Sequence, residues 1–164
     1  MRFLFQRNAA GAAFVHPLQP APRTAILVAG FHESRLIRTF PGGWTEEAQR
    51  FRPTALAAPL NVFHKLAGER IELRHASIVF SYHVHERLSD PDRDWLWRAF
   101  GVPVYEQILG PANNLLAAEC DAHNGLHVMG ELPGVDLELE PCGCGSSVPR
   151  LMQTQPVYAL GARA

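Results

Sequence analysis

Apolar positions along the chain alternate between short continuous runs and helical spacing. Short runs rich in β-forming residues are typical of buried strands, and apolar residues three or four apart are typical of helices. The pattern predicts strands over 24–31, 53–59, 76–83 and 102–109, and helices over 44–51, 60–68 and 89–101. Strands that alternate with helices in this way predict an α/β fold with a small, mainly parallel sheet and flanking helices.

The third predicted helix, "SDPDRDWLWRAFG", carries its own start and stop signals. Ser89 is a favourable N-cap, acidic residues follow it in the first turn, and Gly101 is a favourable residue for ending the helix. Trp95 and Trp97 fall on opposite sides of this helix, so one of them is expected to be exposed. An exposed tryptophan more often marks a partner surface than a cofactor site.

The pattern changes in the last third of the chain. The stretch "LHVMGELPGVDLELE" alternates with period two around Pro133 and Gly134, which predicts a β-hairpin or two short strands. Three segments are therefore expected: an amino-terminal strand and linker over 1–23, an α/β core over 24–112 and a carboxyl-terminal β segment over 113–164.

Composition excludes several classes of protein. The formal net charge is −1, with 15 Lys and Arg against 16 Asp and Glu, so neither nucleic acid nor an anionic membrane is expected as a partner. The apolar run at the amino end breaks at Gln6 and Arg7, too early for a signal peptide. No stretch approaches the roughly 20 apolar residues of a transmembrane helix. We therefore expect a cytoplasmic protein.

The three cysteines of the chain form two groups with a nearby histidine. Cys120 and His123 make a Cys-x-x-His pair, and Cys142 and Cys144 make a Cys-x-Cys pair. Together they supply three thiolates and an imidazole, a recognised tetrahedral set for zinc. Four protein ligands leave no position for a catalytic water, so the pattern predicts a structural zinc site in the 113–164 segment. Its glycines, Gly125, Gly143 and Gly145, would let the backbone turn sharply around the ligands.

Two alternatives stay open for these residues. Buried cysteines are often inert small hydrophobes, so the cysteines need not bind a metal. His127 follows in a predicted strand, and we expect it to be a packed or rim histidine rather than a further ligand. Elsewhere, His83 and His85 in "YHVHERL" would share one face of a strand, but the sequence shows no third ligand beside them. Their role stays open.

Four stretches resemble, in order, the middle of the phenylacetate-CoA ligase family of adenylate-forming enzymes. They are "RPTALAAPLNVFHKLAG", "LSDPDRDWLWRAFGVPVYE", "LLAAECDAHNGLHV" and "EPCGCGSSVPRL", between about residues 50 and 151. The resemblance implies a fragment of the large α/β domain of such an enzyme. It also implies a structural zinc site, carried over onto Cys120, His123, Cys142 and Cys144.

The catalytic motifs of that family do not carry over. The family uses a Ser/Thr/Gly-rich phosphate loop, a Tyr-Gly-x-Thr-Glu motif and an Arg-Tyr-x-x-Gly-Asp motif to activate a carboxylate with ATP. This chain has no such glycine-rich loop, and 108–112 reads "ILGPA" where the Thr-Glu pair is expected. Only "MGELPGVDLELEP" replaces the strands that bear the ribose aspartate, and the sequence stops at Ala164 before any mobile carboxyl-terminal domain. These departures predict a truncated, catalytically degenerate relative.

Two hypotheses follow for function. The first is a non-catalytic zinc-binding accessory or assembly protein, which works through a protein partner or as a homo-oligomer, because a trimmed α/β scaffold exposes apolar faces that need covering. The second is an enzyme, or half of one, that still handles a small acyl or CoA ligand and relies on a partner chain for ATP chemistry. The missing motifs favour the first.

Overall fold

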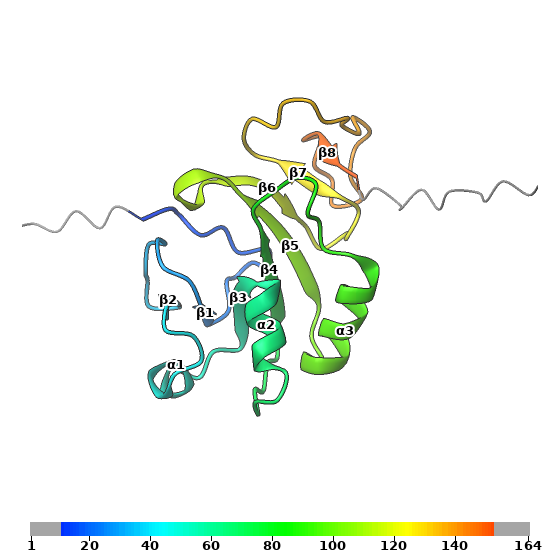
Figure 1. The fold of residues 1–164 in the computed structure, drawn as a ribbon. Helices are drawn as coiled ribbons and strands as arrows, with labels where there is room; N and C mark the ends of the chain where they lie inside the picture. The colour runs from blue at the N-terminus through cyan, green and yellow to red at the C-terminus, as the bar shows by residue number, and fades with distance from the viewer. Residues whose placement is uncertain (1–10, 153–164) are drawn as a thin grey trace, which may run out of the picture.

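The computed structural model describes residues 11–152, and its centre is one eight-stranded sheet with the order β2-β1-β3-β4-β5-β6-β7-β8 (Figure 1). The strands are β1 (Thr24–Ile26), β2 (Ile37–Thr39), β3 (Ala55–Pro59), β4 (Ala76–Ser81), β5 (Val104–Leu109), β6 (Leu115–Glu119), β7 (Leu126–Val128) and β8 (Arg150–Leu151). The helices are α1 (Glu46–Phe51), α2 (Leu60–Leu66), α3 (Asp90–Phe100) and the short 3-10 helix η1 (Pro111–Asn113).

The sheet has a parallel and an antiparallel half. Strands β2, β1, β3, β4 and β5 pair in parallel, whereas β5–β6, β6–β7 and β7–β8 pair antiparallel. Helices connect β3 to β4 to β5, as parallel neighbours require a crossover. The predicted α/β fold with a mostly parallel sheet is confirmed. Among residues 11–152, no helix is long and apolar enough to cross a membrane.

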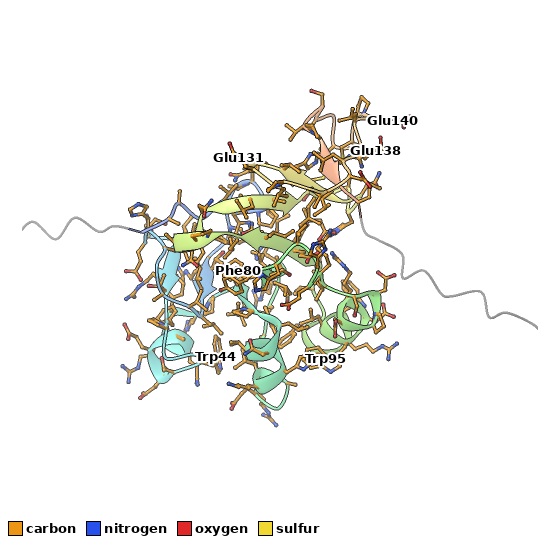
Figure 2. All side chains as sticks on the ribbon, turned by 45° about the horizontal axis from the view of Figure 1, so that its top comes forward. Trp44, Phe80, Trp95, Glu131, Glu138 and Glu140 are labelled. Carbon is orange, nitrogen blue, oxygen red and sulfur yellow. The ribbon has the colours of Figure 1, made fainter. Side chains whose placement is uncertain are left out.

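The three α-helices cover one face of the parallel half (Figure 1). Ala48 of α1, Phe63 of α2 and Leu96 of α3 are fully buried against alternate strand residues such as Leu56 and Val79. Figure 2 shows Trp44 and Trp95 on this helical side of the sheet. Burying a large apolar side chain of this kind stabilises the fold by about 1.5–3 kcal/mol.

The amino-terminal segment covers the opposite face. Phe14 packs edge-on against Phe31 and Phe80, with ring centroids 5.8 and 6.2 Å apart, and Phe31 stacks on Phe80. Gln107 donates from its side-chain amide to the carbonyl of Val15 at 2.7 Å, which ties this segment to β5. Both faces of the central strands are thus buried, which explains their continuous apolar runs.

Helix α3 agrees with its sequence signals. The Ser89 hydroxyl accepts a hydrogen bond from the Asp92 amide, and Gly101 ends the helix in a left-handed conformation. Trp97 is 55% exposed, whereas Trp95 packs against the core. The prediction that one of the two tryptophans is exposed is confirmed.

Other predicted elements are shorter or absent. The first predicted strand stops at Ile26, and β4 ends at Ser81, so His83 and His85 lie in an exposed turn and not on a strand face. The hairpin around Pro133 and Gly134 is not confirmed, because residues 129–149 form no strand and only the isolated bridge of Glu138 to Arg150. Of the predicted amino-terminal strand, residues 1–10 lie outside the described part; residues 11–22 contribute one bridge, from Ala12 to Phe31.

Candidate metal centre

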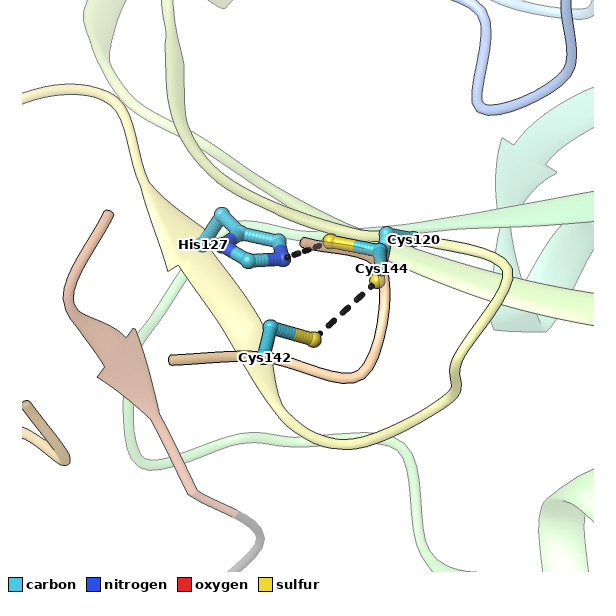
Figure 3. A group of neighbouring side chains, drawn as sticks. All are labelled: Cys120, His127, Cys142 and Cys144. Atoms are coloured by element: carbon cyan, nitrogen blue, oxygen red, sulfur yellow. Dashed lines mark hydrogen bonds between the residues drawn. The ribbon is translucent and has the colours of Figure 1, made fainter. Parts of the chain in front are cut away.

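Three cysteines from two distant turns converge at the antiparallel end of the sheet (Figure 3). Cys120 directly follows β6, and Cys142 and Cys144 lie in the loop that leads to β8. The Sγ atoms of Cys120 and Cys142 are 3.7 Å apart, far longer than the roughly 2.05 Å of a disulfide bond. All three are free thiols. The predicted convergence of the two cysteine groups is therefore present in the fold.

The fourth member of this cluster is His127, on β7. Its Nε2 atom lies 3.4 Å from Cys144 Sγ, and the four potential ligand atoms lie within 4.8 Å of one another. The other ring nitrogen, Nδ1, lies 3.4 Å from the carbonyl oxygen of Val148. Because a carbonyl only accepts, this contact favours the neutral tautomer with the proton on Nδ1, which would direct the Nε2 lone pair at the sulfurs, as in histidines that bind metals.

His123, the histidine predicted from the Cys-x-x-His spacing, is not in the cluster. Its Nδ1 atom lies 3.0 Å from a carboxylate oxygen of Glu119, and its ring packs at 4.8 Å from the ring of Tyr105. His123 closes the turn after β6 in a left-handed conformation, and its amide donates to the Cys120 carbonyl. The turn thus directs this imidazole away from the sulfurs. The structure places His127, which we expected to be only a packed or rim residue, where His123 was predicted.

The donor set fits a tetrahedral ion. With Zn–S bonds of about 2.3 Å and a Zn–N bond of about 2.0 Å, tetrahedral angles separate two sulfurs by about 3.8 Å and a sulfur from a nitrogen by about 3.5 Å. One sulfur–sulfur separation, 3.7 Å, and one sulfur–nitrogen separation, 3.4 Å, match these values, and all four donors lie within 4.8 Å of one another. The cluster could therefore hold a metal ion, and its thiolate-rich chemistry favours zinc over hard cations.

The local environment shifts the pKa values of two of the thiols in opposite directions. A hydrogen bond from the Cys144 backbone is the main influence that lowers the pKa of the Cys142 thiol to about 6, while burial raises the pKa of the Cys120 thiol to about 11. Cys142 is thus the more readily ionised of the two thiols. A bound cation favours the thiolate form of every ligand, so metal binding would release protons.

Tight turns hold both cysteine groups. The Gly145 amide donates to the Cys142 carbonyl at 2.9 Å, with Gly145 at a φ of 88°. Gly125, between the first turn and β7, has a φ of 80°, and a Cβ atom there would lie 2.8 Å from the Leu151 carbonyl oxygen. Gly143 lies within this Cys142–Gly145 turn, as predicted, but it does not adopt a positive φ.

A buried charged network connects the cluster to helix α3. Glu119, next to Cys120, receives two hydrogen bonds from the Arg93 guanidinium, at 3.2 and 3.0 Å, and one from the Glu106 amide. The fully buried Glu106 carboxylate accepts from Arg87, from the Ser81 hydroxyl and from a backbone amide. The sequence does not predict this network, since isolated charged residues in a strand form no periodic pattern.

The other candidate histidines form no site with nearby metal-binding groups. His83 and His85 are exposed, and within residues 11–152 the only group of three or more neighbouring Cys, His, Asp or Glu side chains suited to a metal is the one at Cys120. His127 was predictable only as a second histidine four residues after His123. The local spacing favours His123, so the sequence gives no signal for His127 as the ligand.

This chain is similar to known proteins in its fold but not in its sequence. The sequence matches no protein-family model and no curated protein. Among solved structures, the fold resembles an open conformation of 2-hydroxyisobutyryl-CoA ligase in complex with 2-HIB-AMP and CoA, with a TM-score of 0.58 and 14% sequence identity. The similarity covers 83% of this chain and 45% of that one, so the chain spans less than half the length of the ligase.

The similarity shows the fold alone. The chain has an α/β architecture like that of an adenylate-forming CoA ligase, which agrees with the broader part of the sequence resemblance. Membership of the phenylacetate-CoA ligase family is not shown by this comparison and stays a prediction. A shared fold does not fix activity, because unrelated functions recur on common scaffolds.

Proposed function

We propose that this chain is a non-catalytic zinc-binding accessory or assembly protein on an adenylate-forming-ligase-like scaffold. The observation that carries the proposal is the convergence of Cys120, His127, Cys142 and Cys144 within 4.8 Å. Its four donors would complete a tetrahedral shell and leave no position for a water, which is the arrangement of a structural zinc site. A zinc ion here would act as a cross-link between two segments of the chain.

The position of the cluster supports a structural role. Zinc would join the β6–β7 turn to the long loop before β8, where residues 129–149 have no strand of their own. Leu132 and Val135 pack this loop against the nearby apolar cluster, and ligation would add a second tie near its far end. Structural zinc sites contribute apparent free energies of roughly 10–16 kcal/mol in zinc-finger peptides.

Exposed apolar side chains support a role through a protein partner or a homo-oligomer. Trp97 and Met129 are each 55% exposed, and Leu139 is 71% exposed. Figure 2 shows Glu138 and Glu140, which flank Leu139, on the segment that projects from the antiparallel end. Exposed apolar residues mark an interaction surface where they lie together in one patch, and the proposal requires these side chains to contribute to such a patch.

Metal analysis and stability measurements on the full chain test the proposal. One zinc per chain should be present after purification, and the free energy of unfolding should rise by about 1.4 kcal/mol for each tenfold increase of free zinc above the dissociation constant. ATP binding should be undetectable by calorimetry, and light scattering should give a complex larger than one chain, either alone or with a co-purifying protein. A fully folded chain that binds no zinc would refute the proposal.

A second candidate function is handling of an acyl or CoA ligand, with a partner chain supplying the ATP chemistry. A cleft of about 330 Å³ lies beside the carboxyl ends of β3 and β4, lined by Leu60, Asn61, Phe80, Tyr82 and Leu88 among others. Ligands of open α/β sheets bind at these strand ends. Acyl-dependent exchange of pyrophosphate into ATP, by the chain alone or with a co-purified partner, would support this candidate and contradict the first.

A further inference from the structure

Arg150, on strand β8, is a buried cation beside the metal centre. It is 3% exposed and pairs directly across the antiparallel ladder with His127. Directly opposed residues share a face of the sheet, with Cβ atoms about 4.5–5.5 Å apart. The Arg150 side chain therefore starts on the same face as the imidazole whose Nε2 atom faces the sulfurs.

The guanidinium of Arg150 contacts both ligand-bearing loops. One terminal nitrogen donates to the carbonyl of Asn124 at 2.6 Å, in the turn between Cys120 and His127. The other donates to the carbonyl of Glu140 at 3.2 Å, two residues before Cys142. A single side chain thus joins the two segments that must meet for the cluster to form.

The charge of Arg150 has no carboxylate partner within the described residues. Both guanidinium contacts are to neutral carbonyls, and Nε is buried with no hydrogen-bond partner. The ion pairs recorded between residues 11 and 152 do not include Arg150. Burying a charge without a counter-charge is costly, so the fold implies a negative group near this site.

A zinc-loaded centre would supply that negative charge. A divalent zinc ion with three thiolates and a neutral imidazole has a net charge of −1. On the basis of the proposed zinc site, we infer that Arg150 is a positioning residue of the metal centre, which clamps its two ligand loops and compensates its negative charge. Its contribution to zinc affinity has one part from geometry and one part from charge.

A double-mutant cycle on the full chain separates the two parts. Zinc affinity is measured by chelator competition for wild type, Arg150→Met, Cys144→His and the double variant. Replacing Cys144 with histidine makes the centre neutral, so it removes the need for a counter-charge. Arg150→Met should weaken zinc binding about 10- to 100-fold in the wild-type background, the range for residues that support metal ligands. In the Cys144→His background the loss should be at least threefold smaller.

Arg150→Lys provides the second measurement. Lysine keeps the charge but not the planar fork, so this variant should recover part of the affinity that Arg150→Met loses. The charge-transfer absorption of the cobalt-substituted protein should still report three thiolates in both variants. The Arg150→Lys variant also tests the charge role if Cys144→His does not bind zinc or Arg150→Met does not fold. Its zinc affinity is then compared with that of a neutral Arg150→Gln variant. Wild-type-like affinity in Arg150→Lys supports the charge role, and a loss equal to that of Arg150→Gln overturns it.

The outcomes distinguish this inference from the proposed function. If wild type binds zinc and Arg150→Met binds it equally well, only the role of Arg150 is overturned. Equal losses in the Cys3His and Cys2His2 backgrounds overturn charge compensation and reduce Arg150 to a structural clamp. If the wild-type chain binds no zinc, both the proposed function and this inference fail.

Discussion

Arg93 and Glu119 form a two-pronged ion pair that joins helix α3 to the end of strand β6. Both guanidinium–carboxylate distances are within hydrogen-bond range, at 3.2 and 3.0 Å, and the Glu119 side chain is only 3% exposed. Glu119 is the residue before Cys120, so this pair also anchors one corner of the candidate metal centre. Planar, bidentate pairs of this kind combine strong hydrogen bonds with fixed geometry.

We predict that Arg93→Met destabilises the fold strongly. Removing one partner leaves the Glu119 carboxylate buried without its main counter-charge, and Glu106 loses a second arginine 3.5 Å away. Breaking a buried pair in this way costs about 3–5 kcal/mol. Urea unfolding at saturating zinc measures the change. Arg50→Met is the matched control: its partner Glu46 is exposed, and such a pair contributes only about 0.3–0.5 kcal/mol. Equal effects of the two variants would contradict the role of the network.

The second prediction concerns the two neighbouring histidines. His127→Gln removes a nitrogen donor from the cluster and should weaken zinc binding at least 10-fold, the lower end of the range for perturbing a metal site. His123→Gln keeps a group that can hydrogen-bond to Glu119 and should leave zinc affinity within about threefold of wild type, since less than 1 kcal/mol is involved. Chelator competition measures both. The reverse order would show that His123 is the ligand, as its spacing from Cys120 suggests.

The third prediction concerns the backbone between the ligands. Gly125→Ala places a Cβ atom 2.8 Å from the Leu151 carbonyl oxygen and 3.1 Å from the Met152 sulfur, in addition to an unfavourable φ of 80°. Gly43→Ala shares the positive φ, at 86°, but meets nothing within 4 Å. The control should cost about 1–2 kcal/mol for the left-handed conformation alone. Gly125→Ala should lower the free energy of unfolding by more than this and should also weaken zinc binding. Urea unfolding measures the first effect and zinc titration the second. Equal losses of stability in the two variants would refute the close approach of Gly125 to β8.

The fourth prediction is a pH dependence of stability that originates at His16. This side chain is 4% exposed, and burial lowers its pKa to about 4 from an ordinary 6.5. Because the unfolded chain binds the proton more tightly, the stabilisation is complete above pH 6.5 and falls as the pH drops from 6.5 to 4. The loss approaches about 3 kcal/mol, at 1.36 kcal/mol for each unit of pKa difference.

His16→Asn isolates this effect. Asparagine does not titrate, and its side chain still offers an acceptor for the Leu18 amide that now donates to His16 Nδ1. The difference in unfolding free energy between wild type and variant should therefore shrink or change sign between pH 7 and pH 4, measured at constant zinc saturation. Parallel stability curves would mean that His16 is not buried in its neutral form.

Local signals in the sequence determined much of the fold. Ser89 and Gly101 bound helix α3 because capping depends on side chains within a few residues of the backbone groups they satisfy. The largely apolar run at 76–81 became the central strand β4 because strands buried on both faces are mostly, though not entirely, apolar. The grouping of all three cysteines into two short stretches likewise predicted their convergence.

Tertiary structure alone decided which histidine joins those cysteines. His123 and His127 offer the same imidazole ligand. Only the pairing of β7 with β6 and β8 brings His127 to the sulfurs, while His123 contacts Glu119. Tertiary structure also decided the environment of Arg150. The sequence gives no sign that this arginine is buried. Long-range register fixes these contacts, and no interaction between sequence neighbours encodes it.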